Sequence, residues 1–234
     1  MAWRKNPKNS NMYPWIDYMH SHLRGQCPHE CDYCYTQHMR CVRFYQGTLI
    51  LKEKELKVNY GRGNTIFIEH MNDLFAKDVP GTYIDAILHH CAEYPKNDYV
   101  FQTKNPRRAW EMSEFYPILQ TSLIGTTIET NRENLITEHS KAPPPYERFV
   151  YITKLHGAFQ DTFITVEPVM KFDPEILGGW IAAAHPKFVN IGADSKHCQL
   201  PEPSPKDLNR LLSILKDNNV EVREKHNLGR LLNE

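Results

Sequence analysis

Short runs of β-branched and aromatic residues alternate along this chain with longer runs whose apolar residues recur at helical spacing. This alternation is typical of βα units, in which parallel strands form one sheet and helices cover it. The six predicted strands span residues 18–24, 65–71, 99–103, 122–128, 162–167 and 188–192. The six predicted helices span residues 36–43, 82–93, 106–119, 146–155, 174–184 and 205–218. We therefore expect an α/β fold built on a parallel sheet.

The predicted helix 82–93 has the spacing i, i+3, i+4, i+7 of a stripe that faces a core, formed by Ile84, Ile87, Leu88 and Cys91. Cys91 is therefore predicted to be a core residue. The segment 47–60 instead alternates leucines with charged residues, so we expect it to be an excursion or a hairpin outside the sheet. His20 and His22 lie two positions apart on the first predicted strand and must share one face of it. That face is either the one that lines a cavity or the one that helices cover.

The whole chain is predicted to form one domain, residues 1–234. It has 234 residues with 41% hydrophobic content, which is enough to bury a full core, and no Gly-, Ser- or Pro-rich linker divides it. Lys and Arg together number 28, as do Asp and Glu, so the molecule has no global field that would draw it to nucleic acid or to an acidic membrane. Any contact with a polyanion must be local. With no signal peptide and no long apolar run, the expected compartment is the cytoplasm.

Three of the six cysteines lie close together, Cys27, Cys31 and Cys34, with the spacing C-x3-C-x2-C. Three thiolates this close in sequence can converge on one soft metal centre. A cubane cluster has four irons, so three local ligands leave one iron without a protein ligand. The alternative is a structural zinc site with His29 or His38 as the fourth ligand. Zinc sites, however, usually come as two separated pairs of ligands.

Disulfides are not expected in a reducing cytoplasm. Cys41 and Cys198 are scattered singly but lie closer to the cysteine motif or to the predicted strand ends than Cys91 does. The sequence leaves their roles undecided.

Polar residues cluster where five of the predicted strands end, at 69–73, 102–105, 126–131, 167–168 and 192–195. Sites in parallel α/β folds lie at the carboxyl ends of strands, where loops and helix N-termini meet. One polar strand end means little, because soluble loops are polar in general. Five polar strand ends at the same edge of the sheet predict a site at that edge.

The cysteine motif, with the aromatic residue Tyr33 before its last cysteine, resembles the signature of the radical S-adenosylmethionine (SAM) superfamily. The resemblance implies a partial (β/α)6 barrel of TIM type with the cluster loop after the first strand. It also implies a [4Fe-4S] cluster on Cys27, Cys31 and Cys34, whose open iron binds the amino and carboxyl groups of SAM. An electron from an external donor of the flavodoxin or ferredoxin type then cleaves SAM to a 5'-deoxyadenosyl radical, which abstracts hydrogen from an unactivated carbon.

A narrower resemblance rests on the segments 66–75, 102–106, 124–131, 166–169 and 190–195. They look like the successive motifs of a radical SAM family common in bacteriophage genomes, which is similar to the spore photoproduct lyase group. The likeness runs from about residue 13 to about residue 203, the expected catalytic core.

Two departures from that family concern the substrate contacts. Usual members carry a small residue where His70 or Asn72 stands. They also carry Gly-Gly-Glu where this chain has Gly192-Ala193-Asp194. We expect the frame that binds SAM to survive these changes.

The expected contacts to SAM come from the polar strand ends. Asn72 or Asp73 is a plausible acceptor for the amino group. Tyr33 and the backbone near Gly192 are expected to contact adenine, because a glycine lets the main chain approach closely. The alternative for each polar side chain is an ordinary loop cap or surface hydrogen bond.

Further strand-end residues are expected to bind the ribose of SAM or to take part in the reaction. Thr127 or Glu129 is expected to hold the ribose hydroxyls. Glu167 is expected to act as a proton acceptor or a hydrogen-bond anchor in the barrel mouth. Three cations that follow the third strand are candidates to pair with the SAM carboxylate or a substrate phosphate: Lys104, Arg107 and Arg108. For the two arginines the alternative is a solvated first helical turn.

The substrate is the least constrained part of the prediction. The chain has no cysteine-rich extension for further clusters, which disfavours multi-cluster enzymes that mature peptides. The phage-type resemblance implies nucleic acid or a modified nucleotide as substrate, for example isomerisation of a modified thymine in phage DNA. The alternatives are a lyase that repairs a thymine photoproduct and a zinc-stabilised module that binds nucleic acid.

Overall fold

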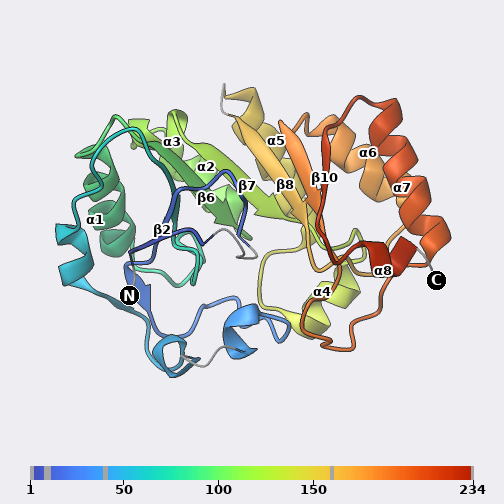
Figure 1. Cartoon of the computed structure of the whole chain (residues 1–234), viewed down its shortest axis with the longest axis horizontal. Coiled ribbons are helices and arrows are strands. Elements are labelled where there is room, and N and C mark those ends of the chain that lie inside the picture. The colour runs from blue at the N-terminus through green and yellow to red at the C-terminus, as the bar shows by residue number, and fades with distance from the viewer. Residues whose placement is uncertain (1–2, 8–11, 39–41, 159–160, 233–234) are drawn as a thin grey trace.

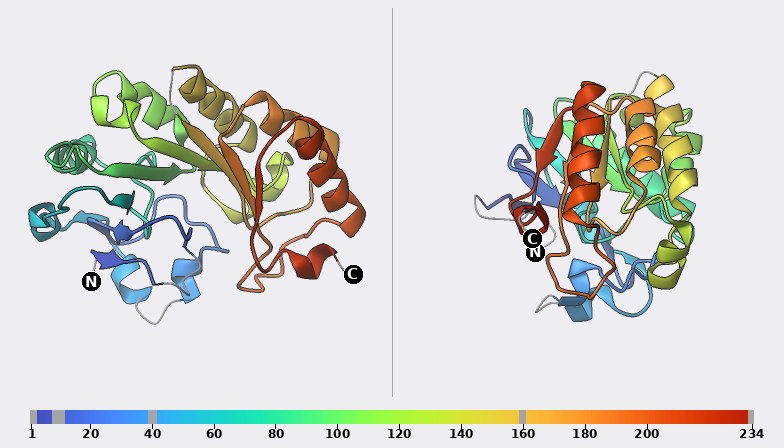
Figure 2. Two further views of the ribbon diagram at one scale, coloured as in Figure 1. Left: turned by 45° about the horizontal axis from the view of Figure 1, so that its top comes forward. Right: turned by 90° about the vertical axis from the view of Figure 1, so that its right-hand side faces the viewer.

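The computed structural model describes residues 3–7, 12–38, 42–158 and 161–232. Its centre is an arched eight-stranded sheet with helices on the convex side (Figures 1 and 2). Seven neighbouring strands run parallel: β2 (Tyr18–His20), β5 (Thr65–Ile68), β6 (Asp98–Thr103), β7 (Leu123–Thr127), β8 (Thr162–Val166), β9 (Phe188–Ile191) and β10 (Val222–Glu224). The short strand β1 (Arg4–Lys5) pairs antiparallel with β2 at one edge.

The helices follow the strands along the chain and form the outer layer. They are α1 (Gly81–Ala92), α2 (Pro106–Ser113), α3 (Pro117–Gln120), α4 (Glu133–His139), α5 (Pro145–Gly157), α6 (Pro174–Ala183), α7 (Pro205–Asp217) and α8 (Gly229–Leu232). Five of them begin with proline, whose fixed φ suits the first helical position and whose missing N–H is not needed there. Ser204 caps α7, because its hydroxyl accepts a hydrogen bond from the Asp207 N–H over 3.1 Å.

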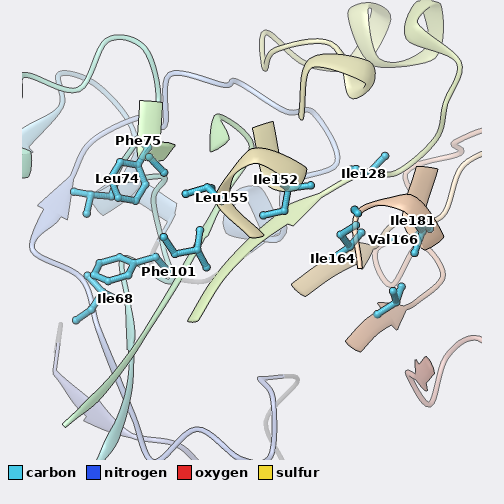
Figure 3. Close-up of a cluster of buried hydrophobic side chains, with 14 of the residues drawn as sticks. Ile68, Leu74, Phe75, Phe101, Ile128, Ile152, Leu155, Ile164, Val166 and Ile181 are labelled. Carbon is cyan, nitrogen blue, oxygen red and sulfur yellow. The ribbon is translucent and has the colours of Figure 1, made fainter. Parts of the chain in front are cut away.

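The sheet has two differently packed faces because side chains alternate along each strand. Outward-facing residues pack under the helices and form the main core, part of which Figure 3 shows, including Ile68, Phe101, Ile164 and Val166. Inward-facing residues form a second apolar cluster inside the barrel: Tyr13, Ile16, Met19, Phe67, Val100, Phe163 and Phe188.

This architecture confirms the predicted α/β partial barrel, but several details differ. The first strand ends at His20, and residues Leu23–Arg24 form β3, which pairs antiparallel with β4 (Ile50–Leu51) apart from the main sheet. The expectation of a hairpin or excursion in 47–60 is thus confirmed, and that segment also holds the 3-10 helix η3 (Glu53–Lys57).

Other predicted elements break or were missed. The predicted helix 36–43 is replaced by two short 3-10 helices, η1 (Tyr35–His38) and η2 (Val42–Tyr45), with residues 39–41 outside the described part. The predicted helix 106–119 ends at Ser113 and restarts at Pro117, because proline cannot continue a helical hydrogen-bond ladder. The seventh parallel strand, β10, and the helix α4 were not predicted. Among the described ranges, no helix combines the length and the apolar character that crossing a bilayer needs.

Candidate cluster and cofactor site

A cavity of about 370 Å³ lies at the carboxyl ends of the parallel strands. Its wall includes all three residues of the cysteine motif, Cys27, Cys31 and Cys34. The other wall residues come mainly from the carboxyl ends of β5 to β9, where the sequence predicted a site. The volume is at the lower end of the range for small-molecule sites, roughly 300 to 1,000 Å³. A larger cavity, of about 1,360 Å³, opens at the amino ends of the strands and has none of these cysteines in its wall.

The cysteine loop follows β3 and is held at both ends by backbone contacts. Gly25 has φ +95°, and a Cβ there would lie 2.2 Å from the Thr48 carbonyl oxygen, so only glycine fits. At the far end, the Asp32 N–H donates to the His139 carbonyl at the end of α4 over 3.1 Å. The loop is therefore clamped between the β3–β4 excursion and α4.

The thiols of the motif are not in disulfides. Cys31 Sγ lies 3.1 Å from the Ser140 hydroxyl, and Cys34 Sγ lies 3.1 Å from the Thr36 hydroxyl. Burial raises the pKa of Cys27 and of Cys31 above the ordinary value of a thiol. A bound cation would reverse this effect, because coordination favours the thiolate.

Asp73 ties the cysteine loop to the strand ends. Its carboxylate accepts hydrogen bonds from His29 Nε2 (2.8 Å), the Thr103 hydroxyl (2.7 Å), the Lys104 N–H (2.7 Å) and the Phe75 N–H (3.0 Å). Burial alone raises the pKa of Asp73, but His29 and these hydrogen bonds outweigh burial and lower it below its usual value. With four donors engaged, Asp73 positions the loop, and its carboxylate is already satisfied.

Asn72 is arranged differently, although it is the neighbouring residue. Its Nδ2 donates to the Gly25 carbonyl over 3.1 Å, while its Oδ1 is buried without a hydrogen-bond partner among the described residues. Asn72 also contributes to the cavity wall. A buried acceptor without a protein partner is costly unless a ligand supplies the donor. Of the two predicted acceptors for the SAM amino group, Asn72 is the one whose side-chain oxygen has no hydrogen-bond partner among the described residues.

Glu129 lies completely buried behind the cavity wall. It accepts a hydrogen bond from the Tyr33 hydroxyl (2.8 Å), pairs with Arg148 Nη1 (2.8 Å) and also pairs with Lys104 Nζ. Burial raises the pKa of Glu129, but Lys104 and Arg148 outweigh burial and lower it to about 2. The structure therefore places Glu129 behind Tyr33 and Lys104, which are the wall residues, and leaves Thr127 as the predicted ribose contact that borders the cavity.

A layer of polar side chains forms the floor of the cavity inside the barrel. The Tyr13 hydroxyl lies 2.9 Å from both the Gln102 Oε1 and the Thr165 hydroxyl. Gln102 Nε2 donates to the Thr127 hydroxyl over 3.0 Å, and Asn190 Nδ2 lies 3.4 Å from the Thr165 hydroxyl. Sequence reasoning missed Tyr13, Thr165 and Asn190. For Thr165 and Asn190 the available signal was a polar residue at an inward position of a mainly apolar strand, whereas Tyr13 precedes the first strand of the parallel sheet.

Glu167 lies at the cavity wall as expected, next to a residue that was not predicted. Its Oε2 pairs with Lys225 Nζ over 3.0 Å, and its peptide bond to Pro168 is cis. Gly192 lies beneath this carboxylate, because a Cβ there would come within 2.9 Å of Glu167 Cδ. The residues that follow Gly192, from Ala193 to Lys196, form the adjoining part of the cavity wall. Lys225 was missed because it follows β10, a strand that the sequence pattern did not reveal.

The two predicted helical cations do not border the cavity. Arg108 donates to the backbone carbonyls of Ala76 (2.6 Å) and Val79 (2.8 Å). Arg107 pairs with Glu111 over 2.8 Å on the exposed side of α2. Arg108 therefore supports a loop and Arg107 belongs to a surface ion pair, so neither lies where it would contact a ligand inside the cavity.

The remaining histidines and cysteines separate into structural and undecided residues. His20 and His22 are buried against His90 of α1, so they face the covered side of the sheet and do not face the cavity. Cys91 is completely buried in the main core, as predicted. Cys198 packs against the small apolar cluster that contains Cys31, and Cys41 lies outside the described residues.

The zinc alternative requires the three cysteines and a fourth ligand, His29 or His38, around one point. Within the described residues, no three His, Cys, Asp or Glu side chains converge on a single metal position. One zinc ion needs its ligands around one point, whereas a cubane cluster takes each thiolate on a different iron. His29 has its Nε2 bonded to Asp73, and the side chain of His38 lies outside the described part of the chain.

Comparison with known proteins identifies a family and a fold. The family described as "Protein of unknown function (DUF5131)" matches residues 15–181. No curated protein matches the sequence. A structure of a spore photoproduct lyase variant is similar with a TM-score of 0.62 at 11% identity, covering 95% of this chain and 81% of that one.

Two further similar structures contain the cofactor predicted here. One is a spore photoproduct lyase variant with bound AdoMet and dinucleoside spore photoproduct, with a TM-score of 0.55 at 12% identity over 91% of this chain and 64% of that one. The other is Streptococcus suis SuiB bound to S-adenosylmethionine, with a TM-score of 0.53 at 12% identity over 86% of this chain and 48% of that one. At these identities the likeness shows the fold, which is radical SAM-like.

Proposed function

The chain belongs to the DUF5131 family, and we propose that it is a radical SAM enzyme whose Cys27, Cys31 and Cys34 hold a [4Fe-4S] cluster beside a bound SAM. One observation carries the proposal. The three cysteines of a C-x3-C-x2-C motif border the same strand-end cavity as Asn72, whose buried Oδ1 has no partner among the described residues. The SAM named in two structures of similar fold supports this proposal.

When bound, the cluster and SAM supply a 5'-deoxyadenosyl radical that abstracts hydrogen from the substrate. The residues of this chain bind and orient the cofactor. Asn72 accepts a hydrogen bond from the SAM amino group, Thr127 holds a ribose hydroxyl, and the Tyr33 ring packs against adenine. Electrons come from an external donor of the flavodoxin or ferredoxin type.

Lys104 and Glu167 both border the cavity and can bind polar or charged groups of a ligand. Lys104 Nζ is paired with the buried Glu129 and lies 4.9 Å from the Tyr33 ring centroid, so its position is fixed. This cation attracts the SAM carboxylate or an anionic part of the substrate. Glu167, paired with Lys225, anchors a polar group of the substrate or accepts a proton from it.

For the substrate we propose a modified thymine or another modified base of DNA, which the enzyme isomerises with no net redox change. The fold of a lyase whose structure contains a dinucleoside photoproduct supports a pyrimidine substrate. The same observation favours a second candidate, repair of a thymine photoproduct. In either case, the reacting nucleotide must leave the base stack to reach this cavity.

The first experiment tests for the cluster. Protein reconstituted anaerobically with iron and sulfide is expected to bind one [4Fe-4S] cluster, seen in its visible absorbance and in the electron paramagnetic resonance of its reduced form. Replacing Cys27, Cys31 or Cys34 by Ala should abolish both signals. Cys91→Ala is the matched control, because that thiol is buried in the main core. Stoichiometric zinc without iron after anaerobic purification would contradict the proposal.

The second experiment separates the substrate candidates. The reduced, reconstituted protein should release 5'-deoxyadenosine from SAM. DNA from cells with and without the protein is then digested and its nucleosides compared by liquid chromatography and mass spectrometry. Isomerisation predicts a nucleoside of unchanged mass and changed retention. Loss of a thymine photoproduct from irradiated DNA, with no such isomer, would replace the isomerase proposal by the lyase proposal.

A further inference from the structure

Phe44 is exposed at the protein surface between two arginines. Its ring is 42% exposed, with the guanidinium of Arg24 at 4.8 Å and that of Arg43 at 5.1 Å from the ring centroid. Two other large apolar side chains of this region, Tyr35 and Ile50, are 41% and 39% exposed. We call Arg24, Arg43 and Phe44 the Arg–Phe surface.

The charge of the Arg–Phe surface is not compensated. Among the described residues, neither Arg24 nor Arg43 has an acidic partner, whereas Lys104 and Arg107 are both paired with glutamates. The segment from residue 42 to residue 62 has only two acidic residues, Glu53 and Glu55. It has five basic ones: Arg43, Lys52, Lys54, Lys57 and Arg62. In a chain with a formal net charge of zero, this is a local excess of positive charge.

The Arg–Phe surface adjoins the cysteine loop. The Gly25 N–H donates to the Phe44 carbonyl over 3.0 Å, two residues before Cys27. Tyr35, which directly follows the last cysteine of the motif, is both exposed and part of the cavity wall. Figure 1 shows the light-blue segment that carries η1 and η2 below the arch of the sheet. The Arg–Phe surface is therefore joined to the cysteine loop by a backbone contact, and the end of that loop at Tyr35 reaches the wall of the proposed SAM cavity.

We propose that the Arg–Phe surface binds a single-stranded stretch of nucleic acid. The two guanidinium groups suit phosphate oxygens, and the exposed part of the Phe44 ring adds an aromatic contact for a base. An acidic protein would also meet the arginines, but it would have no need for an aromatic ring exposed between them. The inference rests on the proposed function in one respect: the bound strand supplies the nucleotide that passes Tyr35 into the cavity.

The test measures binding of a fluorescein-labelled oligothymidylate of about 12 nucleotides, a length within the site sizes of single-strand binders. Fluorescence anisotropy is recorded with the full-length protein over a series of potassium chloride concentrations. The double variant Arg24→Gln, Arg43→Gln should reduce the slope of log affinity against log salt by about 1.4, because each lost phosphate contact removes about 0.7 on a single strand. Phe44→Leu should weaken binding about five- to 150-fold and leave the slope unchanged.

Matched controls come from α2 and from the turn that follows it. Arg107→Gln removes an exposed arginine, and Phe115→Leu removes an aromatic ring that is 75% exposed. Both should bind the oligonucleotide like the parent protein. Circular dichroism checks that the variants fold, which we expect because the replaced side chains are exposed or, for Arg24, partly exposed.

Oligonucleotide binding by the double variant and by Phe44→Leu that equals binding by the parent would overturn the inference. If the double variant also showed slower reduction of the cluster by an acidic flavodoxin, the surface would be assigned to a protein partner. Cleavage of SAM without substrate is measured on the same preparations. Its absence in the parent would contradict the proposed function, whereas normal cleavage without oligonucleotide binding would contradict only the inference made here.

Discussion

Two adjacent residues, Asn72 and Asp73, differ in how far the protein itself satisfies their side-chain oxygens. Asp73 uses its carboxylate within the protein, because His29 and three other donors already satisfy it. Asn72 keeps one buried oxygen without a partner among the described residues. The sequence indicated that this strand end carries the acceptor, but only side-chain geometry distinguishes the two residues.

Replacing Asn72 by Ala is expected to weaken SAM binding about ten- to 150-fold, because one hydrogen bond to a charged group contributes about 1.5 to 3 kcal/mol. The cluster should remain, since no cysteine is touched. Isothermal titration calorimetry gives the affinity and visible absorbance gives the cluster content. Asn209→Ala, an exposed amide on α7, is the control. Equal SAM affinity in Asn72→Ala would place the amino contact elsewhere.

Arg148 is completely buried and belongs to the support of the cavity wall through Glu129. We expect Arg148→Met to lower the free energy of unfolding by about 3 to 5 kcal/mol, because it leaves a buried carboxylate without one of its two cations. Urea unfolding monitored by circular dichroism measures this change. Arg210→Met breaks an exposed ion pair with Glu175 and should leave the unfolding curve unchanged. Similar curves for both variants would show that Arg148 does not support the fold.

At the scale of helices and strands, the sequence predicted those elements that have a clear local signal. The apolar stripe placed α1 to within one residue at each end, and proline marked the start of α6 and α7. The strand β10 was missed because it has three residues, two of them charged, and no inward apolar pattern. The helix α4 was missed because its seven residues bury only Ile136. Both elements are fixed by tertiary contacts that no local pattern records.

The same distinction between local sequence signals and tertiary contacts applies to the candidate site. The cysteine loop and the strand ends were predictable because spacing and parallel topology bring them together. The pairing of Glu167 with Lys225 was not, because β10 is needed to place the lysine. The burial of Glu129 behind Tyr33 also depends on Arg148, which enters from α5, a separate element.

The strands β7 and β8 meet inside the barrel through Gly125 and Phe163. A Cβ at residue 125 would lie 2.2 Å from the Phe163 ring, so Gly125→Ala must displace the ring. We expect a loss of about 1 to 3 kcal/mol in the free energy of unfolding, which Phe163→Leu should partly restore in the double variant. Gly179→Ala, on the open side of α6, should stabilise the protein by about 0.5 to 1 kcal/mol. Additive effects of Gly125→Ala and Phe163→Leu would contradict the contact.

At the scale of the whole molecule, buried histidines link folding to pH. His20 Nδ1 lies 2.6 Å from the Tyr60 hydroxyl, which in turn lies 3.0 Å from His22 Nε2. His22 Nε2 also lies 3.2 Å from His90 Nδ1. Burial lowers the pKa of His20 to about 2 and that of His22 to about 3. It also lowers the pKa of His70 to about 3 and that of His90 below its usual value.

These four imidazoles stay neutral in the folded state, while the unfolded chain takes up their protons below a pKa of about 6.5. The stability that they contribute is therefore present above that pH and is lost as the pH falls, by up to about 1.4 kcal/mol per pH unit for each group. Glu69 has the opposite sign. Burial raises its pKa to about 8, so its contribution is present below its unfolded pKa of about 4.5 and is lost as the pH rises through 8.

The imidazoles outnumber the one opposing carboxyl, so we expect the free energy of unfolding to fall by a few kcal/mol, on the order of 3 to 4, for each pH unit well below 6.5. Urea unfolding at pH 6.5, 5.5 and 4.5 measures this slope. His90→Gln should reduce the proton uptake on unfolding by about one, because glutamine can still donate to the Val58 carbonyl that His90 Nε2 contacts over 2.8 Å. His89→Gln, at an exposed position on the same helix, should leave the slope unchanged. Equal stability of the parent protein at all three pH values would show that these imidazoles are protonated in the folded state as readily as in the unfolded chain.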